Sequence, residues 1–145
     1  MAAATKNRNT AQRAGRRRGY PLAATVHALA GTIAVMNATG FAEPGTTATG
    51  LVALGVFSAE HDNSNGADGA LIAEVERGIF HFDNSEGADE ITASDIGKVC
   101  YLVDDQTVAL TDGTATRSPV GFIDEVDDAG VWVSIDPLQL AALTA

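Results

Sequence analysis

Residues 120–135 read VGFIDEVDDAGVWVSI, and this stretch decides the fold class. Two runs rich in β-branched residues, 120–126 and 131–135, flank the sequence Asp127-Asp128-Ala129-Gly130. A short loop that ends in a glycine, which adopts positive φ without cost, is typical of a β-hairpin. The stretch therefore predicts two antiparallel strands near the end of the chain.

Similar short runs precede this hairpin, separated by turn residues such as Gly, Pro, Asn and Asp. They occupy residues 32–36, 51–57, 71–76, 79–82, 99–103 and 107–110. Only residues 92–96 and 137–143 favour short helical turns, the second because proline suits a helix start. The chain thus predicts a mainly β fold, with a compact β-sandwich or barrel over residues 20–136 and a C-terminal tail over 137–145.

The motif Asp-Asn-Ser-x-Gly-Ala-Asp occurs twice, at residues 62–68 and 83–89. Asp, Asn and Ser side chains bond nearby backbone and glycine supplies positive φ, so each copy predicts a turn. The acids also make the two loops the best candidates for an ion. However, Gly66 stands where a calcium ligand is needed and no Glu closes the first loop. We therefore expect solvated turns and no metal.

The positive charge of the chain is concentrated at its start. Residues 1–18 contain no acid and six basic residues: Lys6, Arg8, Arg13, Arg16, Arg17 and Arg18. The remainder holds the other three of nine basic residues and all 19 acids, a net charge of 3 − 19 = −16. This asymmetry predicts an extended basic arm, residues 1–19, whose six basic side chains contact an acidic partner. The acidic body would repel nucleic acid, so nucleic acid is an unlikely partner except through the arm.

Residue patterns that carry enzyme chemistry do not occur. The chain has no nucleophile elbow, no glycine-rich phosphate loop and no zinc-ligand spacing among its histidines. Cys100 lies in an alternating run and is expected to be buried and unreactive. We expect Trp132 in the core and His81 at a surface or interface. No run of about 20 apolar residues predicts a membrane span. These patterns predict a protein that is not an enzyme and binds no cofactor.

Four stretches carry a resemblance to a known family: GIFHFDNS at 78–85, ITASDIGKVCY at 91–101, DDQTVA at 104–109 and GVWV at 130–133. From Gly55 to Ile135 the chain resembles the head decoration (cement) proteins of tailed bacteriophages. The resemblance implies a compact, tulip-like or sandwich β-domain without catalytic residues. It also implies clusters, commonly trimers, on the outer capsid surface that bridge subunits of the major capsid protein.

The leading prediction is a structural virion protein on the outer capsid surface, with the basic arm clamping the shell and a homo-oligomer, a trimer, as its favoured state. One alternative is a receptor- or glycan-binding virion module that uses the loops 62–68 and 83–90. Another is an internal head protein whose arm touches packaged DNA. A small hydrolase is the last alternative.

Overall fold

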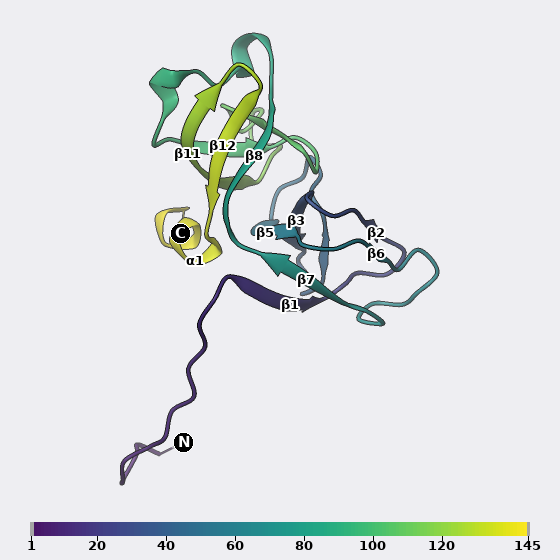
Figure 1. Ribbon diagram of the computed structural model, residues 1–145, viewed down its shortest axis with the longest axis vertical. Coiled ribbons are helices and arrows are strands. Elements are labelled where there is room, and N and C mark those ends of the chain that lie inside the picture. The colour runs from purple at the N-terminus through teal and green to yellow at the C-terminus, as the bar shows by residue number, and fades with distance from the viewer. Residues whose placement is uncertain (1, 145) are drawn as a thin grey trace.

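Strands dominate the computed structural model, which describes residues 2–144 and the side chains of residues 2–140. The predicted mainly β fold is confirmed. The strands form a closed five-stranded barrel, a five-stranded sheet and a two-stranded sheet. In Figure 1 the barrel lies above the five-stranded sheet, and the N-terminal segment leaves the sheet at the bottom.

The barrel has the strand order β10-β8-β12-β11-β9. Its members are β8 (Gly78–Asn84), β9 (Val99–Leu102), β10 (Thr107–Ala109), β11 (Pro119–Asp127) and β12 (Gly130–Ile135). The pairing of β8 with β10 is parallel and the other pairings are antiparallel. The predicted hairpin is β11–β12, with Val126 opposite Val131 and Asp127 opposite Gly130.

The five-stranded sheet has the order β1-β7-β5-β3-β4. Its members are β1 (Arg17–Pro21), β3 (Ile33–Met36), β4 (Ala42–Pro44), β5 (Val52–Phe57) and β7 (Ile72–Glu76). Leu22, just after β1, bridges in parallel to Ala42 of β4. The two edges of the sheet therefore approach each other. Strands β2 (His27–Ala28) and β6 (His61–Asp62) form the small third sheet.

One hydrophobic cluster joins the barrel to the five-stranded sheet. It contains Ile33, Val35, Ala53 and Val56 from β3 and β5 together with barrel residues such as Val120 and Val133. A second cluster, which includes Leu22, Leu54 and Phe57, lies within the sheet half alone. Because the first core is shared, the barrel holds the sheet, and with it strand β1, in a fixed position.

Three short helical elements complete the described part of the chain: η1 (Gly87–Asp89), η2 (Ala93–Asp95) and α1 (Pro137–Thr144). The turn predicted at 92–96 and the helix start at Pro137 are both confirmed. Asp95 holds η2 in place, accepting hydrogen bonds from Thr92 N at 2.9 Å and Lys98 Nζ at 3.0 Å. Helix α1 packs against β5 and β11. Among the described residues, no helix is long and apolar enough to cross a membrane.

The structure corrects one boundary. The basic arm was predicted to reach residue 19, but β1 begins at Arg17 and pairs with β7, with Arg17 opposite Glu76 and Gly19 opposite Glu74. The basic composition of residues 17–19 suggested that they belong to the arm. An edge strand, however, is held by backbone hydrogen bonds to its neighbour and can form without apolar side chains. The segment outside the domain is residues 2–16, called the arm from here on.

Candidate partner-binding surface

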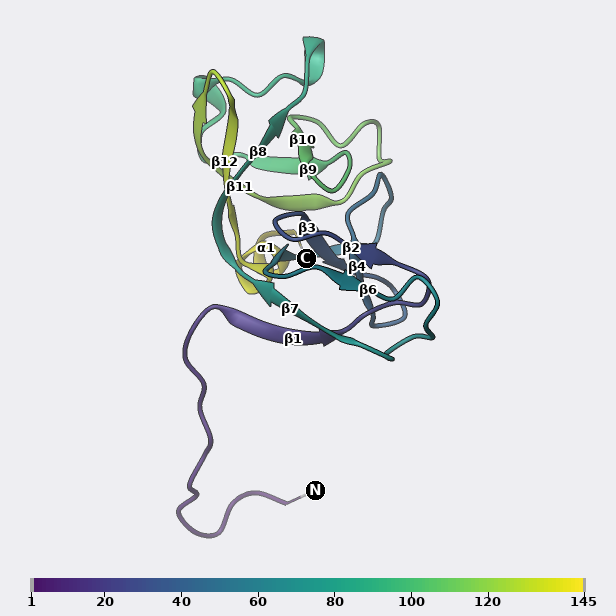
Figure 2. The same ribbon diagram turned by 45° about the vertical axis from the view of Figure 1, so that its right-hand side comes forward.

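The arm is exposed along its whole length and forms no helix or strand. Figures 1 and 2 show it leaving the domain at β1 and extending away from it. Lys6, Arg8 and Arg13 lie on this segment, and within the described part of the chain none of them has a hydrogen bond or ion pair to the domain. Their charges are therefore available to a partner.

The other three predicted contact residues lie where the arm joins the domain. Arg16 O accepts a hydrogen bond from Arg77 N at 3.1 Å. Arg17 forms an ion pair with Glu74 at 3.0 Å, and Arg18 donates to the carbonyl oxygens of Gly15 and Arg17 at 3.1 and 2.8 Å. The structure thus divides the six residues into a free group of three and a group of three at the root of the arm.

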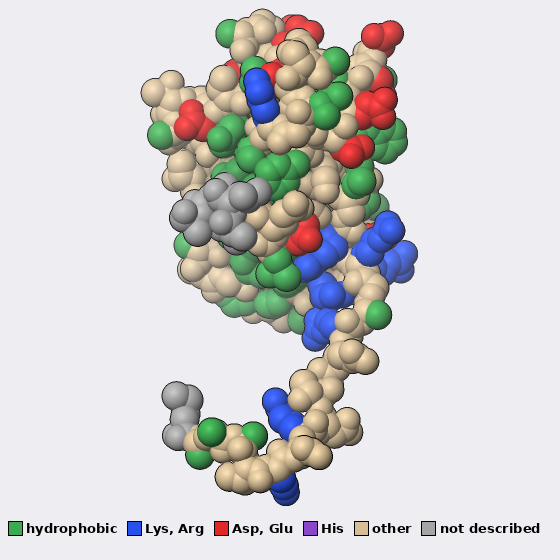
Figure 3. Space-filling view, turned by 90° about the vertical axis from the view of Figure 1, so that its left-hand side faces the viewer, with side chains coloured by type: hydrophobic (Ala, Val, Ile, Leu, Met, Phe, Trp, Pro, Cys, Tyr) green, Lys and Arg blue, Asp and Glu red, His purple; other side chains and the backbone are tan. Residues whose placement is uncertain are grey.

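Arg77 joins the root group, although no sequence pattern singles it out. It lies between β7 and β8, and its guanidinium donates to Tyr20 Oη at 3.2 Å. Arg16 and Arg77 line one shallow hollow together with Gly78, Ile79, Ser134, Ile135, Asp136 and Gln139. Figure 3 shows Lys and Arg side chains gathered where the arm leaves the domain. Only the pairing of β1 with β7 brings Arg77 there, and no local sequence signal encodes that pairing.

The two Asp-Asn-Ser loops are turns closed by their asparagines. Asn63 is buried and donates to the carbonyl oxygens of Ala23 and Ala67 at 2.9 and 3.0 Å. Asn84 donates to Ile91 O at 2.8 Å and accepts from Ile91 N at 3.0 Å. The predicted turns are confirmed. In the described part of the chain, no three His, Cys, Asp or Glu side chains lie close enough together to hold a metal ion.

The second loop lines a groove at the end of the barrel, opposite the β11–β12 hairpin. Five acids border it: Asp83, Glu86, Glu90, Asp127 and Asp128. Asp127 is used within the protein, because it accepts hydrogen bonds from His81 Nε2 and Trp132 Nε1, both at 3.1 Å, and from Gly130 N at 2.8 Å. Its hydrogen bond with His81 is the main cause that holds the pKa of the Asp127 carboxyl below its ordinary value.

The prediction that Trp132 lies in the core is wrong. Its side chain is 38% exposed, and its ring meets that of His81 edge to face at a centroid distance of 5.0 Å. Strand alternation explains the difference, because Val131 and Val133 fill the barrel and Trp132 must then point outward. His81 pairs with Trp132 across the strands and is on the surface, as expected.

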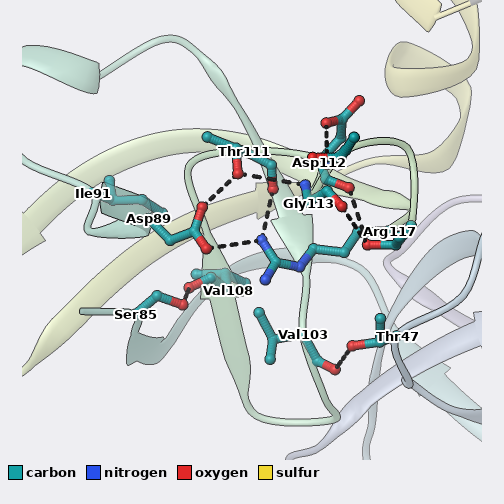
Figure 4. A network of polar contacts seen from close by, with 12 residues as sticks. Thr47, Ser85, Asp89, Ile91, Val103, Val108, Thr111, Asp112, Gly113 and Arg117 are labelled. Carbon is teal, nitrogen blue, oxygen red and sulfur yellow. Dashed lines mark hydrogen bonds and ion pairs between the residues drawn. The ribbon is translucent and has the colours of Figure 1, made fainter. Parts of the chain in front are cut away.

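A polar network fixes the loop before β11 (Figure 4). Arg117 donates to Asp89 Oδ2 at 3.2 Å and to Thr111 O at 3.0 Å, while the Thr111 hydroxyl donates to Asp89. The Thr111 hydroxyl first, and Arg117 second, lower the pKa of the Asp89 carboxyl. The loop contains three successive residues with positive φ, Gly113, Thr114 and Ala115. The network therefore holds a strained turn against η1.

Cys100 is fully buried, and burial raises the pKa of its thiol to about 12. The expected small buried residue is confirmed. A thiol with this pKa is almost wholly protonated at neutral pH and is a poor nucleophile.

The fold and this surface define a class: a mainly β domain with an acidic body and a projecting basic arm. Searches of protein-family models, of curated proteins and of solved structures found no match for the chain.

Proposed function

We propose that this protein decorates the outer surface of a phage head and stabilises it by bridging subunits of the major capsid protein. The observation that carries the proposal is the arm: Lys6, Arg8 and Arg13 project from a folded domain that makes no use of their charges. The resemblance of residues 55–135 to capsid cement proteins supports it. The tulip-like β-domain would form the exposed knob, in clusters for which a trimer is favoured.

Physical arguments favour a protein lattice as the partner of the arm. The domain that begins at Arg17 has five basic residues and 19 acids, a net charge of 5 − 19 = −14, and such a body repels nucleic acid. Arginine pairs bidentately with carboxylates, so a basic arm suits an acidic protein surface. An arm that orders on binding pays entropy for each residue, but many copies clustered on one lattice recover affinity through avidity.

The test compares capsid occupancy of the full chain with that of a variant in which Lys6, Arg8 and Arg13 are replaced by Gln. We expect the triple variant to keep its melting temperature and to lose at least about tenfold in capsid affinity, since three charge-assisted contacts disappear. A matched control replaces Asn7 and Asn9 by Gln and should bind as the full chain does. Equal capsid occupancy by the triple variant would show that these three basic side chains do not contribute to capsid binding.

A second candidate function is glycan or receptor binding at the end of the barrel. The half-exposed Trp132 favours it, because an aromatic ring beside a polar groove suits a sugar face. Glycan-array binding that Trp132→Ala abolishes would support this candidate. Undiminished capsid binding by the same variant would show that the two functions are separate.

A further inference from the structure

We propose that the hollow at the root of the arm, called the root hollow, is a docking site for an acidic polypeptide segment that carries an aliphatic side chain next to its carboxylates. The inference rests on the proposed function for the identity of the partner, which would be a capsid subunit. Its chemistry rests on the hollow alone.

Four segments that are distant in sequence build the root hollow. Arg16 comes from the end of the arm, Arg77 and Ile79 from the junction of β7 with β8, Ser134 from β12 and Gln139 from α1. The hollow has a volume of about 340 Å³, enough for one or two side chains of a partner. Figure 3 shows the Lys and Arg side chains that gather where the arm leaves the domain.

Neither of the two guanidinium groups is neutralised. The Arg77 guanidinium is held by its hydrogen bond to Tyr20, whereas only the backbone of Arg16 is held, by its bond to Arg77 N. The Arg16 guanidinium lies over Gly78, 3.8 Å from where a side chain on that residue would begin. Among the described residues, neither Arg16 nor Arg77 forms an ion pair. A pair of forked donors of this kind suits carboxylates.

Asp136, the acid among the lining residues, and Glu74 both have partners within the protein. Asp136 lines the root hollow, but its carboxylate accepts a hydrogen bond from Leu138 N at 3.0 Å at the start of α1. Glu74, on the neighbouring strand, is paired with Arg17. The balance of charge in the root hollow is therefore positive, on a domain that is otherwise acidic.

Apolar surface beside the arginines makes a polypeptide the better occupant. Ile79, which lines the hollow, is 50% exposed, and Leu138, the residue before Gln139 on α1, is 73% exposed. Ile79 can pack against an aliphatic side chain, whereas a nucleic acid backbone offers it nothing to bury. Nucleic acid is further disfavoured by the charge of the body.

Docking at the root hollow would also direct the arm. Arg16 is both a wall of the hollow and the last residue of the arm, so a segment bound there would fix the point from which residues 2–15 continue along the partner. Binding at the root hollow would thus set the direction in which the arm runs along the surface of the partner.

The experiment uses the full chain with Lys6, Arg8 and Arg13 replaced by Gln, so that the arm contributes no charge of its own. The probe is a fluorescein-labelled peptide of alternating Glu and Leu, titrated by fluorescence anisotropy. We expect Arg16→Gln with Arg77→Gln to weaken binding at least about tenfold, and Ile79→Gln about threefold. Arg77→Lys, which keeps the charge but not the fork, should restore part of the loss.

A control variant matches the isoleucine change. Ile96→Gln alters an isoleucine that is 52% exposed but lies at the end of η2, away from the residues that line the hollow. It should bind the peptide within about twofold of the parent. Melting temperatures show that each variant is folded.

The inference is overturned if the double arginine variant binds the peptide as tightly as its parent does. It is also overturned if a single-stranded oligonucleotide of the same charge binds as tightly as the peptide. The outcomes separate the inference from the proposed function. Peptide binding that depends on Arg16, Arg77 and Ile79, without capsid binding by the full chain, would sustain the root hollow and reject decoration. Capsid binding by the full chain, together with peptide binding that does not depend on Arg16, Arg77 or Ile79, would support decoration and reject the root hollow.

Discussion

At the residue scale, Asp127 organises the tip of the β11–β12 hairpin. Its carboxylate accepts hydrogen bonds from two backbone N–H groups of the turn, Ala129 and Gly130, and from the side chains of His81 and Trp132. Its neighbour Asp128 is equally exposed, but within the described part of the chain its carboxylate forms no hydrogen bond or ion pair. Two adjacent acids with similar sequence settings therefore have different roles.

We expect Asp127→Ala to lower the urea midpoint of unfolding clearly and Asp128→Ala to leave it almost unchanged. The first change leaves several donors without an acceptor, whereas the second removes only a solvated charge. Trp132 fluorescence should also change in the first variant alone, since Trp132 Nε1 loses its partner. Equal unfolding midpoints would contradict the role given to Asp127.

The loss of stability in acid follows from carboxylates that accept hydrogen bonds, Asp127 among them. The pKa values of Asp89, Asp95 and Asp127 are lowered from 3.8, chiefly by hydrogen bonds from Thr111, Thr92 and His81 respectively. Groups of this kind contribute stability above the unfolded value of 3.8 that is lost as pH falls through their folded values. Burial, with Asp104 nearby, raises the pKa of Asp105, which has the opposite effect.

The expected result is a melting temperature that is steady from about pH 7 to 5 and falls below about pH 4. Asp89→Asn should flatten that fall, because one of the contributing groups is removed. Calorimetry at a series of pH values measures both, and a steeper fall in the variant would contradict the assignment.

The buried thiol of Cys100 should not react with an aromatic disulfide reagent in the native protein at pH 8. Its pKa of about 12 and its burial both prevent thiolate attack. Reaction should become complete in denaturant. Rapid native labelling would show that the barrel core opens.

At the scale of elements, the tightest contact between backbones is the approach of β5 to the end of its paired strand β7. Gly55 has a φ of +144°, and a Cβ there would lie 2.1 Å from Glu76 O. Only glycine permits this approach of two backbones.

Gly55→Ala should cost about 2–4 kcal/mol of unfolding free energy, because it adds a clash with backbone to an unfavourable φ. Gly50→Ala provides the matched control: its φ is +78° but a Cβ there meets nothing within 4 Å. That variant should lose only about 1 kcal/mol. Urea unfolding measures both, and similar losses would mean that the approach of the two backbones is not tight.

Local patterns predicted the elements well where the sequence itself encodes them. The β11–β12 hairpin follows from Gly130 and its flanking runs, and α1 begins at Pro137 as expected. The closure of the barrel through the parallel pairing of β8 with β10 has no local signature. Trp132 was misplaced because hydrophobicity alone does not show which face of a strand a residue occupies.

At the scale of the whole molecule, the positive and negative charges are separated in space, because the basic arm extends outside the acidic domain. Charge alone identified the six basic residues, but not that Arg17 belongs to β1 or that Arg77 joins Arg16 in the root hollow. Those relations depend on the pairing of β1 with β7, which are far apart in the sequence. A truncation that tests the arm must therefore end before Arg16.

Removal of residues 2–14 separates the role of the arm from that of the folded domain. The domain should keep its melting temperature, because β1 and its contacts remain, and its affinity for the outer surface of the phage head should fall at least about tenfold at moderate salt. Quantitative capsid sedimentation with the full chain and the truncated chain provides the comparison. Equal occupancy of the capsid by the two proteins, both folded, would contradict the account.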